Sequence, residues 1–435
     1  MRSHPVFDVL ANRGIRLGLD RVRALLTALG EPHRQAPVVH VAGTNGKGST
    51  CMFVTSALVQ AGYRVGTTLS PHIEELNERI RFDGVPVDDP TLASAIESLE
   101  REVAEWASTM GIKDSPLTYF EFATVLAFRM FAEAAVDVVV VEVGMGGRLD
   151  ATNVVSPQVC AITSIGMDHV EHLGATLALI AGEKAGILKR GVPVVIGVLP
   201  QEAREVVEAR AKSIAAPLWR PGADMVREQR KDLWSFRTPA GSIANARLGL
   251  DGVHQGTNAL VALGVLHRLR QQGFHVPDEA ILAGFASVTF SGRIETLLPG
   301  LIVDGAHNED GAKALAAWLQ TRPRPKSRIL IFGQGFERDP GPIVAPLLPF
   351  FDEVVTASCQ HPKARDAASL ALILEGKVPN LSEGGPIEDV LPEIYREADE
   401  TIVTGSLFLA GAARSMVRAG ALAGITPGQG PAQEE

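Results

Sequence analysis

The feature that most constrains the fold of this sequence is a series of short, almost wholly apolar runs rich in valine and isoleucine. Seven such runs lie at residues 38–41, 138–143, 161–163, 194–196, 301–303, 329–331 and 402–404. Strands that are apolar along their whole length are typical of parallel sheets, because helices cover both faces of such a sheet. Between the runs, apolar residues recur at intervals of three and four, which predicts helices at residues 92–106, 120–134, 258–271, 312–320 and 407–418. The sequence therefore predicts an α/β fold.

The chain of 435 residues is long enough for two or three domains. Residues 217–252 contain tryptophans and prolines without helical spacing, so we expect hairpins or irregular structure there. Strands and helices alternate again after Gly300. We therefore expect an N-terminal domain at residues 1–295 and a smaller α/β domain at residues 296–425. Residues 426–435, with proline, glycine and glutamine and no apolar pattern, are predicted to form a disordered tail.

A glycine-rich loop follows the first apolar run and leads into a helical segment. Its residues are Gly43, Thr44, Asn45, Gly46, Lys47, Gly48 and Ser49. Glycines let backbone N–H groups surround an anion, a lysine adds positive charge, and a hydroxyl at the start of a helix can bind Mg²⁺. The loop is two residues shorter than the Walker A pattern, and Gly48 separates the lysine from the serine. A turn without a ligand is the alternative, but the combination predicts a site for nucleotide phosphates.

Three further side chains suited to catalysis follow later apolar runs. Glu142 ends one run before a glycine turn, where α/β sheets hold ligands and Mg²⁺, although an exposed strand-end acid is the alternative. His169 could be a metal ligand, a base or a structural histidine, and the structural role is the most common. Lys184 lies among small residues and could pair with an anion, or its pKa could be low enough for it to react with CO₂ and become an anionic oxygen ligand. The residues alone favour the ion pair.

Composition argues against several classes of protein. The formal net charge of −9 disfavours a nucleic-acid binder held by phosphate contacts, and 4 Trp, 3 Tyr and 16 Phe offer few surfaces for base stacking. The 3 cysteines form no CxxC pair, so neither a disulfide framework nor a zinc cluster is expected. No apolar run approaches the ~20 residues that span a bilayer, and the N-terminus lacks a signal-peptide core. We expect a cytoplasmic protein without a nucleic-acid or membrane partner.

An ordered set of motifs extends over most of the chain, from about residue 17 to residue 411. The motifs are Leu17–Val22, Gly43–Ser49, Ser70–His72, Asn77–Ile80, Leu117–Glu121, Glu142–Asn153, Asp168–His169, Glu183–Gly186, His254–Gln255 with Asn258, Gly292–Arg293, Asp304–Asn308 and Thr404–Ser406. Together they resemble the folylpolyglutamate synthase and dihydrofolate synthase family, within the Mur ligase superfamily. Any one motif could arise by chance, whereas the ordered set is highly specific. The expected fold is a P-loop ATPase-type N-terminal domain with a mostly parallel sheet, followed by a smaller Rossmann-like C-terminal domain.

The resemblance implies the ATP-dependent attachment of L-glutamate to a folate carboxylate. The γ-phosphoryl group moves to that carboxylate, and the glutamate amine then attacks the acyl phosphate. Such a transfer needs positioning and cations rather than a covalent nucleophile of the enzyme. The implied small-molecule partners are ATP, L-glutamate, dihydropteroate and reduced folates, with two Mg²⁺ ions as cofactors.

The resemblance also implies a role for each matching residue. The nucleotide would be bound by Gly43, Thr44, Asn45, Gly46, Lys47, Gly48, Ser49, Asn258, Arg293 and Asp304. Metal ligands would be Ser49, Ser70 and Glu142 on one ion, with His169 and a carbamylated Lys184 on the second. Asp20, Arg21, Tyr119, Phe120 and Asp150 would line the pteroate pocket, and Arg79, His307 and Ser406 would bind glutamate. The catalytic set would be Lys47, Lys184, His169 and Arg293.

For Lys184 the resemblance reverses the preference drawn from the residues alone, because a carbamate offers the anionic oxygen that a hard cation needs. Three residues depart from the family pattern: Glu309 replaces a proline, Arg338 replaces a lysine and Ser291 replaces a proline. These departures affect details of the second domain rather than the reaction.

Two other functions are alternatives for these motifs. A peptidoglycan Mur ligase normally carries a uridine-nucleotide domain before the phosphate loop, but only 42 residues precede Gly43 here. A nucleotide-dependent switch would not need Glu142, His169 and Lys184 together. The Leu117–Glu121 segment and the Leu19–Arg21 stretch are compatible with a pteroate pocket. We therefore expect a bifunctional, monomeric enzyme that makes dihydrofolate and also polyglutamylates tetrahydrofolate, with a monofunctional folylpolyglutamate synthase as the alternative.

Overall fold

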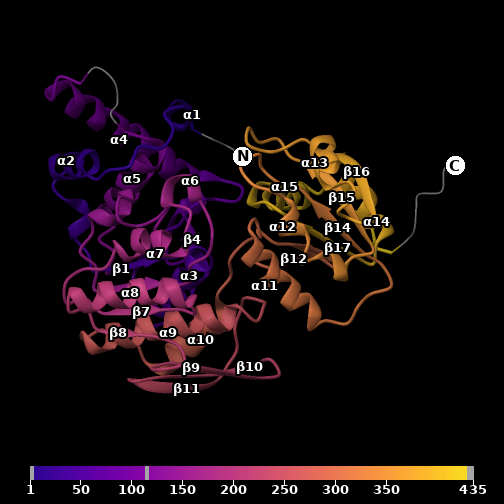
Figure 1. The fold of residues 1–435 in the computed structure, drawn as a ribbon. Coiled ribbons are helices and arrows are strands. Elements are labelled where there is room, and N and C mark those ends of the chain that lie inside the picture. The colour runs from indigo at the N-terminus through magenta and orange to yellow at the C-terminus, as the bar shows by residue number, and fades with distance from the viewer. Residues whose placement is uncertain (1–3, 113–116, 429–435) are drawn as a thin grey trace. The chain divides into compact units, whose positions relative to one another are not determined.

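The computed structural model describes residues 4–112 and 117–428, and the chain divides into two compact units (Figure 1). Unit 1 comprises Met1–Gly249 and Gln255–Thr289, and unit 2 comprises Leu250–His254 and Phe290–Glu435. The predicted boundary at residue 295 thus falls inside unit 2. Leu250–His254 also belongs to unit 2. Gly252 packs closely against Ile294 of that unit, because a Cβ atom on Gly252 would lie 3.0 Å from Cδ1 of Ile294.

Unit 1 is built on an eight-stranded sheet. In spatial order its strands are β4 (Val85–Pro86), β3 (Ile80–Phe82), β2 (Val65–Thr68), β5 (Val138–Glu142), β1 (Val38–Ala42), β6 (Val159–Ile162), β7 (Val194–Ile196) and β8 (Leu218–Trp219). The six strands from β2 to β8 in this order are parallel, whereas β3 and β4 pair antiparallel. Central strands β1 and β5 are buried along their whole length, as the apolar runs predict.

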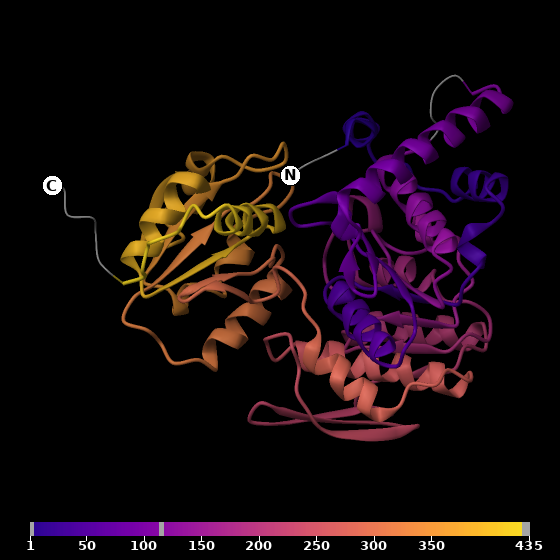
Figure 2. The ribbon, with the colours of Figure 1, turned by 180° about the vertical axis from the view of Figure 1, so that it is seen from behind.

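Helices cover both faces of this sheet (Figures 1 and 2). One face packs against α2 (Asp20–Ala28), α4 (Asp89–Thr109), α5 (Tyr119–Glu133), α7 (Leu177–Ala185) and α8 (Gln201–Ser213). On the other face lie α3 (Lys47–Gln60) and α9 (Gln255–Gln271), with α10 (Asp278–Ser287) packed on α3. Short helices α1 (Pro5–Ala11) and α6 (Val170–Leu173) contribute Phe7, Leu10 and Leu173 to the cores on the first of these faces. The sequence places the start of α5 because Thr118 and Glu121 form a capping box there.

The segment predicted to form hairpins contains a three-stranded antiparallel sheet. Its strands are β9 (Val226–Arg230), β10 (Leu233–Thr238) and β11 (Gly241–Ala246), with β10 in the middle. The sheet lies along α9 and α10 (Figure 2). Buried Trp234 explains part of this packing, because a Cβ atom on Gly256 in α9 would lie 2.2 Å from its ring.

Unit 2 has a six-stranded sheet with helices on both faces. In spatial order the strands are β12 (Glu295–Leu298), β13 (Leu301–Val303), β17 (Glu400–Thr404), β14 (Arg328–Phe332), β15 (Glu353–Ser358) and β16 (Leu381–Pro386). All are parallel except β12. One core holds α11 (Glu309–Gln320), α12 (Gly341–Val344) and α13 (Ala367–Leu374), and the other holds α14 (Ile387–Glu397) and α15 (Leu407–Arg418). This doubly covered parallel sheet confirms the predicted Rossmann-like class.

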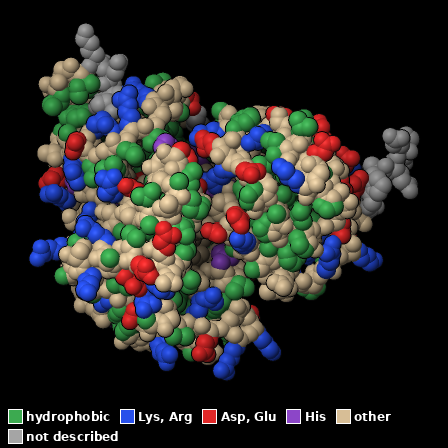
Figure 3. All heavy atoms as spheres, in the orientation of Figure 1, with side chains coloured by type: hydrophobic (Ala, Val, Ile, Leu, Met, Phe, Trp, Pro, Cys, Tyr) green, Lys and Arg blue, Asp and Glu red, His purple; other side chains and the backbone are tan. Residues whose placement is uncertain are grey.

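The predicted runs and helices all appear, with ends that shift by a few residues. Part of the predicted disordered tail, residues 429–435, lies outside the described residues, whereas the N–H group of Gly428 donates to the carbonyl of Ala398 at 3.0 Å. Within the described ranges, no helix is both long and apolar enough to cross a membrane. On the face drawn in Figure 3, acidic and basic side chains are interspersed, so the net charge of −9 is not gathered in one patch there.

Candidate active site

The strand order of unit 1 brings four predicted segments to one edge of the sheet. Strands β2, β5, β1 and β6 are neighbours in that order and run parallel. Ser70 follows β2, Glu142 ends β5, the phosphate loop follows β1, and His169 follows β6. Ligands bind at the carboxyl ends of strands in folds of this kind. The sheet thus brings together residues that lie far apart in the sequence.

The phosphate loop ends at the N-terminus of α3, which begins at Lys47. Gly46 caps this helix with a φ of 81°, a conformation that favours glycine. The Nζ atom of Lys47 donates to the carbonyl of Thr44 at 3.1 Å and lies 3.9 Å from Oε1 of Glu142. Ser49 is buried in the first turn of α3. The first N–H groups of a helix have no partner within the helix, and together with the helix dipole and the lysine they make this end of α3 suited to phosphate.

The residues just after β6 hold the phosphate loop in shape. The hydroxyl of Ser164 accepts from the N–H group of Asn45 and donates to its carbonyl, both at 2.9 Å. Thr163 Oγ1 donates to the same carbonyl at 2.6 Å, and the N–H group of Thr44 donates to the carbonyl of Ser164 at 2.8 Å. Neither Thr163 nor Ser164 was predicted as a site residue. Their position as the first polar residues after a buried central strand is the signal that could have identified them.

Asn258, a predicted nucleotide contact on α9, lies directly against the loop. Its side chain is buried, and a Cβ atom on Gly46 would lie 2.3 Å from Oδ1 of Asn258. Position 46 therefore requires glycine for two reasons, the positive φ and the nearby amide.

Replacing Gly46 with alanine is expected to weaken ADP binding by at least about tenfold, because the new methyl group displaces the Asn258 amide or the loop itself. The matched control is Gly62→Ala. Gly62 also has a positive φ of 90°, but a Cβ atom there would meet nothing within 4 Å. Both variants should lose about 1–2 kcal/mol of unfolding free energy from backbone strain, and only Gly46→Ala should lose affinity in a calorimetric ADP titration. Equal affinities for the two variants would contradict this role of the loop.

Oxygen donors suited to Mg²⁺ meet beside Lys47. Ser70 donates its backbone N–H to Oε2 of buried Glu142 at 2.9 Å, and the buried Oγ of Ser70 has no hydrogen-bond partner within the described residues. A carboxylate and an unsatisfied hydroxyl fit a hard cation that takes oxygen ligands. No group of three or more His, Cys, Asp or Glu residues in the described part of the chain is placed to hold a metal ion. A metal here would therefore depend on hydroxyl groups and on oxygens of the nucleotide.

Lys184 lies near the end of α7 and reaches the phosphate loop. It is buried, and its Nζ donates to the carbonyl of Gly43 at 2.8 Å. Burial, with Lys47 nearby, lowers the pKa of Lys184 to about 7, although Asp168 and Asp150 oppose the shift. A large fraction of this amine is thus neutral near neutral pH, which is the form that reacts with CO₂.

His169 caps α6 in the left-handed region, with a φ of 48°. Its ring lies 3.9 Å from Asp168 and 3.9 Å from Glu171, and its side chain is partly exposed. Backbone strain of this kind often marks functional sites. Joint binding of a metal by His169 and Lys184 stays a prediction.

The predicted pteroate residues Tyr119 and Phe120 form the first turn of α5. The guanidinium of Arg79, a predicted glutamate residue, lies 5.1 Å from the centre of the Tyr119 ring. The Phe120 ring rests on Gly144, where a Cβ atom would lie 2.4 Å from its Cζ. The structure therefore links Arg79 to the predicted pteroate side of unit 1.

Of the other three predicted pteroate residues, Arg21 and Asp150 already have structural partners. Asp20 is an exposed residue in the first turn of α2. Arg21 forms an ion pair with buried Glu121 at 2.7 Å, which ties α2 to α5. The Asp150 carboxylate accepts from the N–H groups of Met145 and Thr152 at 2.8 and 3.0 Å. The pteroate roles of these three residues stay predictions.

A buried histidine extends the Asp150 network beneath the phosphate loop. His40 in β1 lies with Nε2 2.9 Å from Oγ1 of Thr152, and that hydroxyl donates to Asp150 at 2.5 Å. Burial lowers the pKa of His40 to about 3. His267 is similar, because its Nδ1 lies 2.6 Å from Oγ1 of Thr238 and burial lowers its pKa to about 4.

These two histidines predict a loss of stability in acid. Below a pH of about 6.5 the unfolded chain protonates them while the folded chain does not. Each should therefore lower the free energy of unfolding by about 1.4 kcal/mol per pH unit down to its folded pKa. The free energy of unfolding, measured with urea between about pH 6 and pH 4.5, should fall less steeply with decreasing pH for His40→Asn than for the unmodified protein. Identical slopes would contradict a neutral, buried His40.

Two predicted nucleotide residues belong to unit 2. Asp304 follows β13, and its carboxylate accepts from the N–H groups of Ile294 and Ala306 at 2.8 and 2.9 Å. Burial raises the pKa of Asp304, and Arg293 opposes this shift. Arg293 donates to the carbonyl of Gly292 at 2.9 Å. Their contacts with the nucleotide stay predictions.

The remaining glutamate residues, His307 and Ser406, also lie in unit 2. Nδ1 of His307 lies 2.7 Å from the carbonyl oxygen of Gly305. Ser406 caps α15, where its hydroxyl accepts from the N–H group of Leu409 at 3.1 Å. A helix cap is a sufficient structural reason for this serine, so its glutamate role stays a prediction.

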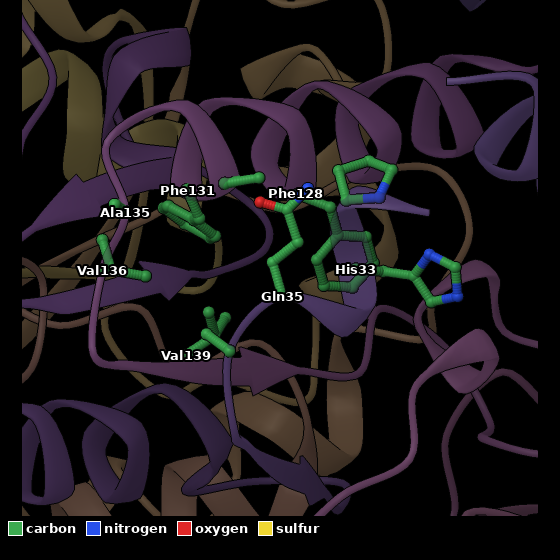
Figure 4. Close-up of a pocket in the computed structure, with 10 residues that line it drawn as sticks. His33, Gln35, Phe128, Phe131, Ala135, Val136 and Val139 are labelled. Atoms are coloured by element: carbon green, nitrogen blue, oxygen red, sulfur yellow. The ribbon is translucent and has the colours of Figure 1, made fainter. Parts of the chain in front are cut away.

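The described residues also line a cavity of about 280 Å³ between α5 and the short helix η1 (Pro32–Arg34). Figure 4 shows Phe131, Val136 and Val139 around it. A second cavity of about 280 Å³ lies at Arg270–Asp278. None of the predicted site residues lines either cavity, so neither is part of the candidate site.

Two domain models and several curated relatives match this chain. The Mur ligase middle domain matches residues 90–266, and the Mur ligase glutamate ligase domain matches residues 292–407. A dihydrofolate synthase/folylpolyglutamate synthase of Bacillus subtilis (strain 168) is 35% identical over 407 residues, which cover 91% of this chain and 94% of the relative. The chain belongs to the folylpolyglutamate synthase/dihydrofolate synthase family.

Solved structures of this family share the whole fold. Mycobacterium tuberculosis folylpolyglutamate synthase complexed with ADP is 35% identical and aligns with a TM-score of 0.87, covering 94% of this chain and 97% of the other. E. coli FolC in complex with DHPP and ADP is 31% identical, with a TM-score of 0.85 and coverage of 95% and 96%. These similarities confirm the predicted family and fold class.

Two departures from the family pattern have local explanations. Glu309 begins α11 and pairs with Lys313 at 2.6 Å, so a proline is not needed to start this helix. Arg338 donates a hydrogen bond to the carbonyl of His307 and thereby supports that loop. Nothing in the structure explains Ser291.

Proposed function

We propose that this chain is an ATP-dependent ligase that joins L-glutamate to folates. The observation that carries the proposal is the meeting of Lys47, Glu142 and Lys184 at the phosphate loop, at the carboxyl edge of the unit 1 sheet. The chain is similar over nearly its whole length to relatives named dihydrofolate synthase/folylpolyglutamate synthase. Unit 1 would bind ATP and the folate, and unit 2, which contains the matched glutamate ligase domain, would contribute Arg293, Asp304, His307 and Ser406.

The reaction begins with activation of the folate carboxylate. Backbone N–H groups at the start of α3 and the Lys47 ammonium hold the phosphates of ATP and offset the charge that develops as the γ-phosphoryl group leaves ADP. The resulting acyl phosphate has a good leaving group. Attack by the neutral glutamate amine forms the amide bond and releases phosphate and a proton.

Ser49, Ser70 and Glu142 would hold Mg²⁺, which supplies charge stabilisation to transferring phosphoryl groups. Lys184 would supply an anionic oxygen after carbamylation, in which the neutral Nζ forms a bond to the carbon of CO₂ and loses a proton. The low pKa of Lys184 and its place 2.8 Å from the Gly43 carbonyl support this step. His169 would share the second ion with that oxygen.

Both activities of the family are proposed for this chain. Tyr119, Phe120 and Arg79 lie together at the start of α5, and Tyr119 and Phe120 offer aromatic surface to a pteroate ring system. Among the relatives, those of B. subtilis and M. tuberculosis are named for both activities, whereas that of Lacticaseibacillus casei is named folylpolyglutamate synthase alone. A monofunctional folylpolyglutamate synthase is therefore the second candidate.

ADP release by the purified protein tests the ligase function. The rate should be low with ATP alone and should rise when L-glutamate and a folate are both present, because amide formation consumes the acyl phosphate. A nucleotide-dependent switch would instead release ADP at a rate indifferent to both substrates. That result would exclude the ligase.

A further inference from the structure

Gln255 is a buried polar residue beside the phosphate loop that none of the roles above includes. It is the first residue of α9 and is completely buried. Its Oε1 accepts from Nδ2 of Asn258 at 2.9 Å, one helical turn further along. Within the described residues its Nε2 has no hydrogen-bond partner. A buried amide without partners is costly, so the bond to Asn258 offsets part of the cost of burying Gln255. This bond is also the contact through which Gln255 can influence the phosphate loop.

In the structure this bond forms with one of the two orientations of the Asn258 amide. A carbonyl oxygen of Gln255 can accept only from Nδ2, which leaves Oδ1 of Asn258 facing Gly46. Gly46 caps α3, and the first backbone N–H groups of a helix are donors without partners in the helix itself. An oxygen is favourable at such a helix end, whereas an NH₂ group would place donors against donors.

We propose that Gln255 is a positioning residue for nucleotide binding. It holds Asn258 with its oxygen toward Gly46 and so keeps the phosphate loop in the shape that receives the phosphates. Without the acceptor on Gln255, the buried Nδ2 of Asn258 loses its partner and the amide is free to rotate by half a turn. The inference rests on the nucleotide-binding function proposed above for the loop and Asn258.

Calorimetric titration with ADP tests this role. Gln255→Met removes the acceptor but keeps a side chain of similar length, and the dissociation constant for ADP should rise about tenfold, or about 1.4 kcal/mol. Gln255→Ala should raise the dissociation constant to the same extent. It serves as the test variant if Gln255→Met does not unfold cooperatively. The matched control is Gln271→Met on the same helix. Exposed Gln271 accepts from Arg268 at 3.0 Å, and this variant should bind ADP like the unmodified protein.

A double-mutant cycle separates this inference from the nucleotide role itself. Asn258→Ala should weaken ADP binding, and Gln255→Met combined with Asn258→Ala should bind no more weakly than Asn258→Ala alone. Additive losses, or unchanged affinity in both Gln255 variants while Asn258→Ala binds weakly, would overturn the positioning role alone. Unchanged affinity in Asn258→Ala would overturn the nucleotide role of Asn258, and the positioning role with it.

Discussion

Replacing Lys184 with alanine is expected to lower the rate of glutamate ligation by at least about 100-fold, because it removes the proposed anionic oxygen ligand beside the phosphate loop. The buried ammonium has a pKa of about 7, so the neutral amine that reacts with CO₂ is available near neutral pH. A short-chain carboxylic acid should restore part of the activity of the variant, since its oxygens can occupy the space of the carbamate. Native mass spectrometry of the unmodified protein should show the added mass of one CO₂, absent from Lys184→Ala.

Lys189 provides the matched control for this experiment. It lies five residues beyond Lys184, burial also lowers its pKa, and its Nζ donates to Oδ1 of Asn153 at 2.7 Å. Lys189→Ala should keep its ligase activity and its CO₂ adduct. Full activity of Lys184→Ala would refute the ligand role.

Replacing Glu142 with glutamine should lower kcat by about 100-fold and raise the Mg²⁺ concentration needed for half-maximal activity. The amide oxygen can still accept from the N–H group of Ser70, so the local structure should persist. The substitution removes only the negative charge of Glu142, which lies beside Lys47 and near the Ser70 hydroxyl. Initial rates of ADP release over a Mg²⁺ titration measure both effects.

Glu400→Gln is the control for removing a buried carboxylate elsewhere. Glu400 is buried in unit 2 and pairs with Arg328 at 2.5 Å and Arg322 at 2.8 Å. Its loss should lower the unfolding midpoint, because buried Arg328 keeps its charge without its carboxylate partner. The Mg²⁺ dependence should not change. If Glu142→Gln shows the same Mg²⁺ dependence as the unmodified protein, Glu142 is not a metal ligand.

Much of the fold could be predicted because the central strands are apolar on both sides. Strands β1 and β5 need no alternation of polar residues, so their valine runs stand out in the sequence. Glu142 could be identified in the same way, as a carboxylate that ends such a run. The strand order that places it beside the phosphate loop came only from the structure.

The less predictable residues act through contacts between distant segments. Ser164 binds the backbone of Asn45, which lies 119 residues away, so only its position just after a buried central strand marks it in the sequence. For Asp150 the motif predicts a pteroate contact, but it does not reveal that the carboxylate also accepts from two backbone N–H groups. Leu250–His254 likewise belongs to unit 2 through packing that its sequence does not reveal.

Formation of a glutamyl–folate amide bond is tested most directly by mass spectrometry of the reaction products. The purified protein is supplied with ATP, Mg²⁺ and L-glutamate, and with dihydropteroate or tetrahydrofolate in separate reactions. A product from tetrahydrofolate alone would restrict the enzyme to polyglutamylation. We predict that each substrate gains the mass of a glutamyl residue as ADP is released, whereas ADP release without a glutamylated product from either substrate would contradict the proposed function.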